Sequence, residues 1–158
     1  MRSSTDVHDE LDARGVAHDI IQLDAPSHTA LQAAAAVGAP VEAVVKSLLF
    51  MADGRPVLTL VGGDATVDTE ALARELHADV VRLARPREVR ELTGYEPGAV
   101  PPVALVTVLP VVADPQVFAP DVVYCGGGTT TTLLGIRGAD LEALLAPRKA
   151  SVGRRASP

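Results

Sequence analysis

The sequence of 158 residues is poor in several residue types, and each shortage excludes a class of protein. Cys125 is the only cysteine, so an internal disulfide is excluded and a reducing compartment is expected. Tryptophan is absent and aromatic residues make up 3%, so the core must be built mainly from alanine, valine and leucine. No apolar run reaches the roughly 18–20 residues of a membrane span, and the polar N-terminus has no apolar signal core. We therefore expect a cytoplasmic protein with no membrane contact.

Basic residues are also in short supply. The formal net charge of −6 argues against a general nucleic-acid coat protein, although a single local contact with nucleic acid stays open. The last twelve residues are the exception, because they contain four basic residues and no acid: Arg148, Lys149, Arg154 and Arg155. The length predicts one domain, residues 1–146, followed by a basic, flexible tail, residues 147–158. A solvated tail and an arm that contacts phosphate are the two interpretations of this segment.

Helix and strand patterns alternate irregularly along the chain. Apolar spacing, capping residues and glycine or proline stops predict helices over residues 4–14, 29–37, 68–76, 86–92 and 139–145. Apolar runs predict strands over residues 18–23, 44–50, 56–62, 79–83, 103–108, 111–113, 121–125 and 131–136. Asp53-Gly54 is a turn signal that joins two of these strands into a hairpin. Hairpins mixed with crossovers favour an α/β fold with a mixed sheet.

Lys46 is the one charge within VVKSLLF, a run that otherwise reads as a buried strand. The pair Lys46-Ser47 is not the end of a phosphate-binding loop, because Val45 stands where glycine is required and the lysine lies within a strand. One interpretation is an edge-strand lysine that discourages aggregation. The other is a functional cation that projects into a pocket.

Most conventional catalytic motifs are missing. The triple glycine, residues 126–128, is followed by the strand-like TTTTLLGI and not by the helix of a dinucleotide-binding fingerprint. It indicates either a close approach of backbone to a ligand or chain, or a flexible turn. The four histidines have no metal-ligand spacing, so no metal site is expected. Cys125 has no local base and is better interpreted as a buried thiol than as a nucleophile.

Several segments, taken in this order, resemble the YbaK/EbsC family, the free-standing relatives of the prolyl-tRNA synthetase editing domain. The resemblance covers about residues 28–145 and rests on HTALQAAAAVG, VVKSLLF, GYEPGAVPP, LPVVAD and VYCGGG. Its most specific part is VVKSLLF followed about fifty residues later by GYEPGAVPP. The resemblance implies an α/β fold with a mixed, barrel-like β-sheet flanked by helices, and an aminoacyl-tRNA deacylase activity without a cofactor.

The resemblance also implies site residues. The family's strand lysine matches Lys46, which we expect to pair with a phosphate at the tRNA 3′ end. Its Gly-x-x-x-Pro motif matches Gly98 to Pro102, where the glycine backbone is expected to hold the amino-acid end of the substrate. The remaining substrate-binding candidates come from the same segments and are Thr29, Ser47, Gly126, Gly127 and Gly128. Ser47 is the weaker of these, because a regular strand points it away from the Lys46 face.

One departure from the family concerns the loop after the glycines. In the bacterial YbaK branch this loop carries an acidic residue, whereas no acid occurs between Cys125 and Ile136. The amino-acid preference of that branch therefore does not transfer. We expect trans-editing of tRNA-Pro or a related tRNA mischarged with a small amino acid such as Ala, Cys, Ser or Thr. The alternative is a non-catalytic module that binds aminoacyl-tRNA 3′ ends or a tRNA synthetase partner.

Overall fold

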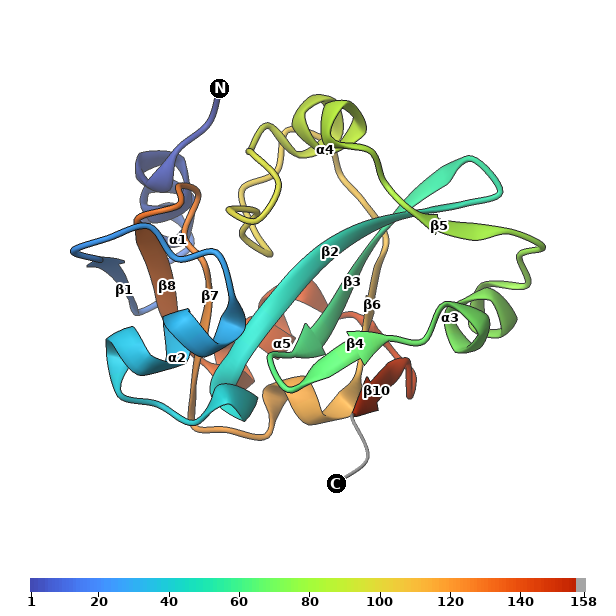
Figure 1. The fold of residues 1–158 in the computed structure, drawn as a ribbon. Coiled ribbons are helices and arrows are strands. Elements are labelled where there is room, and N and C mark those ends of the chain that lie inside the picture. The colour runs from blue at the N-terminus through green and yellow to red at the C-terminus, as the bar shows by residue number, and fades with distance from the viewer. Residues whose placement is uncertain (156–158) are drawn as a thin grey trace.

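The computed structural model describes residues 1–155, which form an α/β fold (Figure 1). The helices are α1 (Ser4–Ala13), α2 (Ala30–Val37), α3 (Thr69–Leu76), α4 (Pro86–Thr93) and α5 (Gly138–Leu145), with short 3-10 turns η1 (Val41–Ala43) and η2 (Pro115–Phe118). The strands are β1 (His18–Gln22), β2 (Val44–Ala52), β3 (Arg55–Gly62), β4 (Ala65–Val67), β5 (Val81–Leu83), β6 (Val111–Ala113), β7 (Val122–Gly126), β8 (Thr132–Arg137), β9 (Arg148–Lys149) and β10 (Gly153–Arg155).

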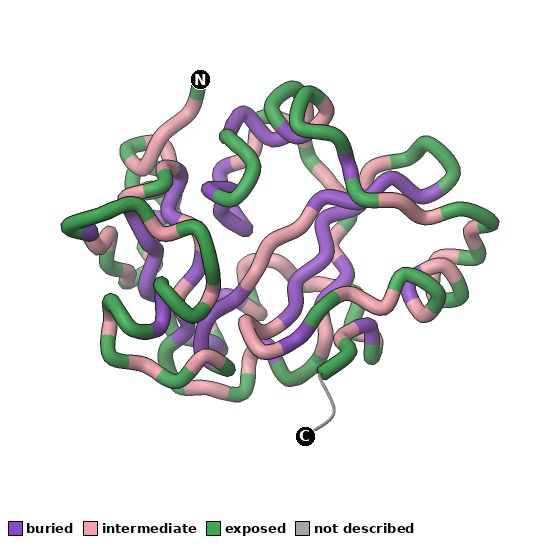
Figure 2. Tube along the Cα trace, viewed as in Figure 1, coloured by how far each residue is buried: buried purple, intermediate pink, exposed green. Residues whose placement is uncertain are grey.

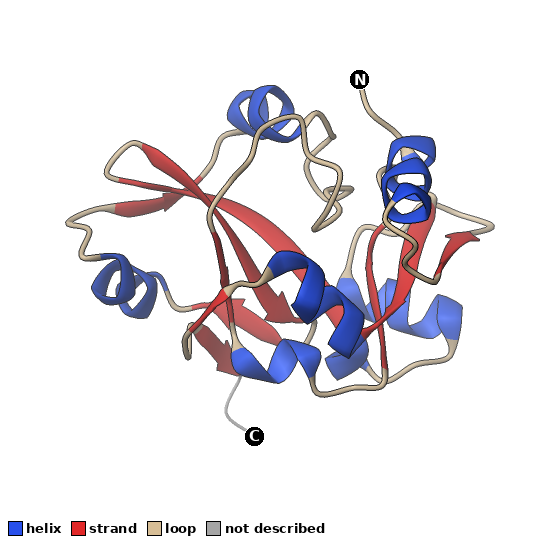
Figure 3. Cartoon of the chain, turned by 180° about the vertical axis from the view of Figure 1, so that it is seen from behind, coloured by secondary structure: helices blue, strands red, loops and turns tan. Residues whose placement is uncertain are grey.

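The main sheet is mixed and has β2 near its centre. Its order is β1-β8-β7-β2-β3-β6-β9, and β5 pairs with β2 as well. Strands β7 and β6 run parallel to β2 and β3 respectively, whereas β1–β8, β7–β8 and β2–β3 are antiparallel. Strands β4 and β10 form a separate two-stranded sheet. The predicted class, a mixed sheet flanked by helices, is confirmed, and the helices on the far side are seen in Figure 3.

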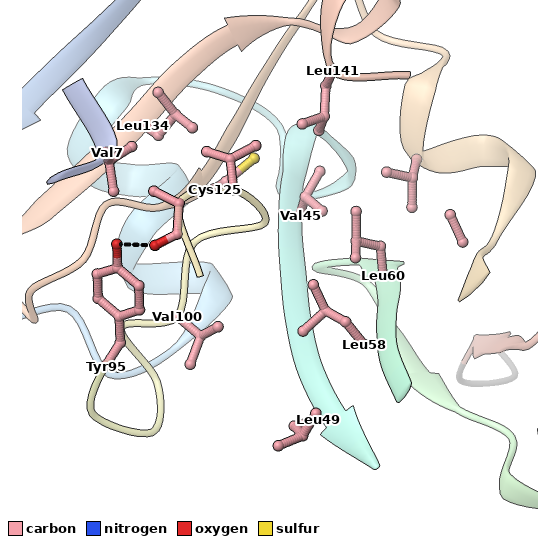
Figure 4. Packing of buried hydrophobic residues seen from close by; sticks show 14 of the residues in the cluster. Val7, Val45, Leu49, Leu58, Leu60, Tyr95, Val100, Cys125, Leu134 and Leu141 are labelled. Atoms are coloured by element: carbon pink, nitrogen blue, oxygen red, sulfur yellow. Dashed lines mark hydrogen bonds between the residues drawn. The ribbon is translucent and has the colours of Figure 1, made fainter. Parts of the chain in front are cut away.

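The β2–β3 hairpin is buried on both faces, which explains why its sequence is a continuous apolar run and not an alternating one. Val45, Leu49 and Leu58 join the larger core cluster, whereas Phe50 and Val61 join a second cluster on the other face. Figure 2 shows the buried residues concentrated along these strands, and Figure 4 shows the packing of the larger cluster. The hairpin turn is Asp53-Gly54, as predicted, and both residues have positive φ.

Residues 103–108, predicted to be a strand, are a loop. Ala104 has a φ of 60°, in the left-handed region, which breaks an extended chain. Its carbonyl accepts hydrogen bonds from Tyr95 Oη and Arg2 Nη1, and its N–H donates to Glu10 Oε2. At Ala104, side chains therefore make the hydrogen bonds that a neighbouring strand would make. Val108, at the other end of the predicted strand, is fully exposed.

The basic C-terminal segment is folded onto the body through residue 155. Strand β9 pairs with β6, and β10 pairs with β4. Each of its four basic residues makes an ion pair with an acid of the body: Arg148 with Glu75, Lys149 with Glu142, Arg154 with Asp68 and Arg155 with Asp64. The flexible tail expected from the sequence is therefore ordered through residue 155, because acidic residues of the domain bind its basic side chains. Residues 156–158 lie outside the described part of the chain.

In residues 1–155, no helix has the length and apolar character needed to cross a membrane.

Candidate functional site

The candidate site lies where strand β2 lacks a neighbour on one of its edges. On that edge β7 pairs only with Val44 and Val45, and β5 pairs only with residues 50–52. No strand among the described residues is in register with residues 46–49 there, whereas β3 pairs with all four on the opposite edge. In Figure 1, β7 lies toward the lower-left part of β2 and β5 lies beside its upper-right part. This arrangement, the β2 fork, leaves main chain open in the middle of the sheet.

The hydrogen bonds along β2 indicate which main-chain groups face the fork. The Val44 carbonyl accepts from Gly63 N on the β3 side, and the Leu49 carbonyl accepts from Ala84 N on the β5 side. Because these directions alternate along a strand, the N–H and C=O of Ser47 face the fork. Unpaired main-chain groups bind hydrogen-bonding partners strongly, so this edge is suited to a ligand.

A cavity of about 200 Å³ opens at the fork. Its walls come from five segments that are far apart in the chain: residues 27–33, 44–48, 98–100, 125–126 and 129–133. None of the described residues that line it is Asp or Glu, and Lys46 is its one permanent cation. An anionic ligand group therefore meets one opposite charge and no carboxylate on the cavity wall.

Lys46 is half-buried on the second face of β2, and its ammonium donates a hydrogen bond to the carbonyl of Ala65 in β4. Burial lowers the pKa of Lys46 from its ordinary value, because desolvation disfavours the charged form, and the negative charge of Asp64 opposes this shift. Within the described part of the chain, residues 46–49 have a strand on only one side, so they form a local edge of the sheet. This agrees with the interpretation of Lys46 as an edge-strand lysine that discourages aggregation. That edge, however, borders a cavity lined by five segments.

Ser47 lies on the opposite face of β2 from Lys46, as strand alternation predicts, between Val45 and Leu49 of the larger core. Its Oγ is buried and has no hydrogen-bond partner among the described residues, although Ser47 as a residue is partly exposed and lines the cavity. A buried hydroxyl without a partner costs about 1–3 kcal/mol, which a polar ligand atom can offset. Ser47 therefore offers both main-chain and side-chain groups.

The glycine- and proline-rich loop, residues 94–102, forms the wall that faces β2. Gly98 has a φ of 86° and an exposed position, with no atom within 4 Å of an added Cβ. The neighbouring Ala99 and Val100 are buried, and the Ala99 carbonyl accepts from Gly128 N at 3.0 Å. The loop is therefore anchored next to Gly98, and its tip lines the cavity.

The triple glycine packs backbone against backbone. A Cβ on Gly126 would lie 2.4 Å from the Val100 carbonyl oxygen, and one on Gly127 would lie 2.7 Å from the main chain of Thr132. Gly128 has a φ of 101° and approaches the main chain of Ser3. Of the two interpretations of this segment, the geometry fits close approach. The approach is to other parts of the same chain, and it holds the Gly98 loop against β7.

Comparison with known proteins identifies the family. Residues 24–144 match the family described as the aminoacyl-tRNA editing domain, which covers most of the chain. The chain belongs to this family. The resemblance seen in the sequence is thereby confirmed, and the editing domain occupies the segments that build the cavity.

Solved structures similar to this editing domain cover nearly all of it. One protein, proposed to be a trans-editing enzyme for prolyl tRNA synthetase, is 35% identical with a TM-score of 0.90 over 98% of both chains. The crystal structure of a hypothetical protein, APE2540, is 31% identical with a TM-score of 0.88, over 94% of this chain and 99% of that one.

Curated relatives include proline–tRNA ligases. The ligase of Nitratidesulfovibrio vulgaris (strain Hildenborough) is 41% identical over 90 residues, which are 57% of this chain and 16% of the ligase. The ligase of Bacillus subtilis (strain 168) is 47% identical over 78 residues, which are 49% of this chain and 14% of the ligase. The editing domain thus matches about one-sixth of the length of these relatives.

The cavity of the editing domain brings together five of the candidate residues named from the sequence: Thr29, Lys46, Ser47, Gly98 and Gly126. Pro102, Gly127 and Gly128 are buried and are not among the residues that line it. The Thr29 hydroxyl accepts from Gln32 N at 3.1 Å as the N-cap of α2. Its position in the cavity wall is therefore also explained by helix capping.

Sequence reasoning missed other members of this wall. Thr129 and Thr132 line the cavity, and their hydroxyl oxygens are 2.7 Å apart. Two residues outside the wall also act on the Lys46 head, Ala65 through its carbonyl and Asp64 through its charge, and neither carries a motif that would single it out. Cys125 also lines the cavity but is fully buried, and desolvation raises the pKa of its thiol to about 12. Such a thiol is neutral near pH 7, which fits a packing role.

Proposed function

We propose that this editing domain is a trans-editing hydrolase that cleaves the ester bond of mischarged aminoacyl-tRNA. The observation that carries the proposal is a half-buried lysine in the wall of a cavity that has no carboxylate among its described residues; the ammonium binds the neutral carbonyl of Ala65. The substrate class comes from the family match over residues 24–144 and from the relative proposed to act in trans for prolyl tRNA synthetase. The expected partner is the 3′ end of an aminoacyl-tRNA in the cytoplasm, with tRNA-Pro or a related tRNA as the carrier.

The size of the cavity supports a small amino acid. About 200 Å³ is below the roughly 300–1,000 Å³ of clefts that hold drug-sized ligands. Walls formed by Ala30, Ala33 and Val100 leave apolar contacts for a short side chain. Alanine, cysteine, serine and threonine are therefore the amino acids to test.

In the proposed reaction, water attacks the ester carbonyl, the carbonyl oxygen gains negative charge, and the 3′-terminal ribose oxygen leaves with a proton. No carboxylate lines the described cavity, so activation of the water is assigned to the neighbouring ribose hydroxyl of the substrate. Lys46 pairs with a terminal phosphate, and the main chain at Gly98 and Gly126 holds the amino-acid end. Orientation of an already activated ester can supply on the order of 7–11 kcal/mol of the barrier.

The test is deacylation of tRNA-Pro charged with Ala, Cys, Ser or Thr by the wild type and by Lys46→Met. Methionine keeps much of the side-chain length without the charge. Loss of a positioning charge is expected to reduce kcat/KM by on the order of 10²–10³ for the preferred substrate. Circular dichroism and thermal unfolding serve as controls for folding. A fully active Lys46→Met protein with unchanged stability would remove Lys46 from the site.

A binding module is the second candidate function. The observation that favours it is that no described residue of the cavity wall is a carboxylate and that His28 is the one histidine in it. Such a module would bind the aminoacyl-tRNA 3′ end, or a tRNA synthetase, without turnover. Tight binding of a charged tRNA whose ester stays intact over hours would support this function over the hydrolase.

A further inference from the structure

The C-terminal strand β10 reaches the surroundings of Lys46 through β4. Arg155 of β10 is in register with Ala65 of β4, and the Ala65 carbonyl accepts the hydrogen bond from the Lys46 ammonium. Arg155 Nε also donates to Asp64 Oδ2 at 2.6 Å. Figure 1 shows β4 and β10 side by side next to the β2–β3 hairpin. Arg155 thus contacts both Ala65 and Asp64, the two residues that act on the lysine head.

Of the described charged groups near the Lys46 head, Asp64 and Arg155 form an ion pair and Lys46 does not. Within residues 1–155 Lys46 makes no ion pair, although the charge of Asp64 acts on it. Asp64 Oδ2 is engaged by Arg155, whereas Asp64 Oδ1 is buried and has no hydrogen-bond partner among the described residues. A buried carboxylate oxygen without a partner is unfavourable, and a nearby ammonium is the group that would relieve it. An internal Lys46–Asp64 ion pair is therefore the competing arrangement.

We propose that Arg155 is a positioning residue: it holds Asp64 and so leaves the Lys46 ammonium available for an anionic group of the ligand. The inference rests on the proposed function for the role of Lys46, and it assigns a role to the basic C-terminal segment. A guanidinium suits this position because it is permanently charged and its donors have a fixed geometry. Asp114 and Glu42 also act electrostatically on Arg155, which strengthens its attachment to this corner of the molecule.

Arg154 provides a matched control on the same strand. It precedes Arg155, pairs with Asp68 at 3.0 Å and belongs to the same β10–β4 ladder. Arg154→Gln and Arg155→Gln therefore remove the same charge and one ion pair each, from adjacent residues. Asp68 is the N-cap of α3, whereas Asp64 is the acid whose charge acts on Lys46. A general effect of charge or of β10 stability should appear in both variants.

The experiment measures kcat and KM for the preferred mischarged tRNA in four proteins. Arg155→Gln is expected to raise KM about tenfold, because Lys46 turns to Asp64. Arg154→Gln is expected to stay within about twofold of the wild type. The double variant Asp64→Asn/Arg155→Gln is expected to recover to within about threefold of the wild type, since no carboxylate remains to capture Lys46. Wild-type kinetics in Arg155→Gln, or no recovery in the double variant, would overturn the proposal.

A crystal structure of Arg155→Gln tests the same inference without any activity. It is expected to show Lys46 Nζ within about 4 Å of an Asp64 carboxylate oxygen. A lysine that still binds only the Ala65 carbonyl, with Asp64 apart from it, would contradict the proposal. If the wild type hydrolyses no mischarged tRNA, the proposed function fails, and this structure still decides whether Arg155 holds Asp64 away from Lys46.

Discussion

Tyr95 is a fully buried residue whose hydroxyl donates to the Ala104 carbonyl at 2.8 Å (Figure 4). The bond holds a non-glycine residue with positive φ in the loop that follows the Gly98 segment. Tyr95→Phe is expected to lower the free energy of unfolding by about 0.5–1.5 kcal/mol, because it removes one buried hydrogen bond and keeps the ring. Urea denaturation measures the change. Tyr124→Phe is the control, since no hydrogen bond to the Tyr124 hydroxyl occurs among the described residues, and an equal loss in both variants would refute the assignment.

At the scale of elements, the loop that carries Gly98 can be compared with the β2–β3 turn. Gly98 and Gly54 have φ values of 86° and 78°, and neither has an atom within 4 Å of an added Cβ. Gly98→Ala and Gly54→Ala should therefore each cost a similar roughly 1–2 kcal/mol of stability, from left-handed backbone alone. Only Gly98 lines the cavity, so only its variant is expected to slow deacylation, by about tenfold or more. Equal activities, measured at matched folded fraction, would argue against a role for the loop tip.

At the scale of the whole molecule, burial of Cys125 makes stability depend on alkaline pH. The pKa of its thiol is about 12 in the folded protein, against an ordinary value of 9.0. Above pH 9 the unfolded chain therefore loses this proton first, and stability falls by about 1.4 kcal/mol per pH unit until the folded pKa is reached. Burial also raises the pKa of Tyr95 to about 12, which adds to the fall above pH 10. Denaturant unfolding from pH 8 to 11 measures the slope, which Cys125→Ala should reduce.

Local chemistry made much of the fold predictable. The long apolar run of β2 and the Asp53-Gly54 turn define a hairpin whose partners are adjacent in sequence. Strands β4, β9 and β10 were missed because they are two or three residues long and pair with distant segments. The predicted strand over residues 103–108 is wrong because side chains from Arg2, Glu10 and Tyr95 take the main-chain hydrogen bonds of Ala104, whose φ is positive.

The candidate site was predictable only in part. Lys46 stood out because a charge inside an apolar run is unusual, and Gly98 stood out within a proline-rich loop. The roles assigned to both stay predictions. Gly127 and Gly128 were named for the same reason, a glycine in a loop, but they pack against the main chain of Thr132 and Ser3. The sequence could not separate these cases, because glycine permits close approach to a ligand and to another part of the chain alike. Asp64 and Arg155 carry no such signal, because only the fold brings β10 to the lysine.

The β2 fork has a consequence for how this site tolerates substitution. Its central hydrogen-bonding groups belong to the main chain at Ser47, and every amino acid except proline carries the same N–H and C=O. Side chains around the cavity can therefore change, and with them its selectivity, while the fork retains the same donor and acceptor. A substitution at position 47 whose side chain fits between Val45 and Leu49 therefore changes the lining of the cavity and keeps the main-chain donor and acceptor.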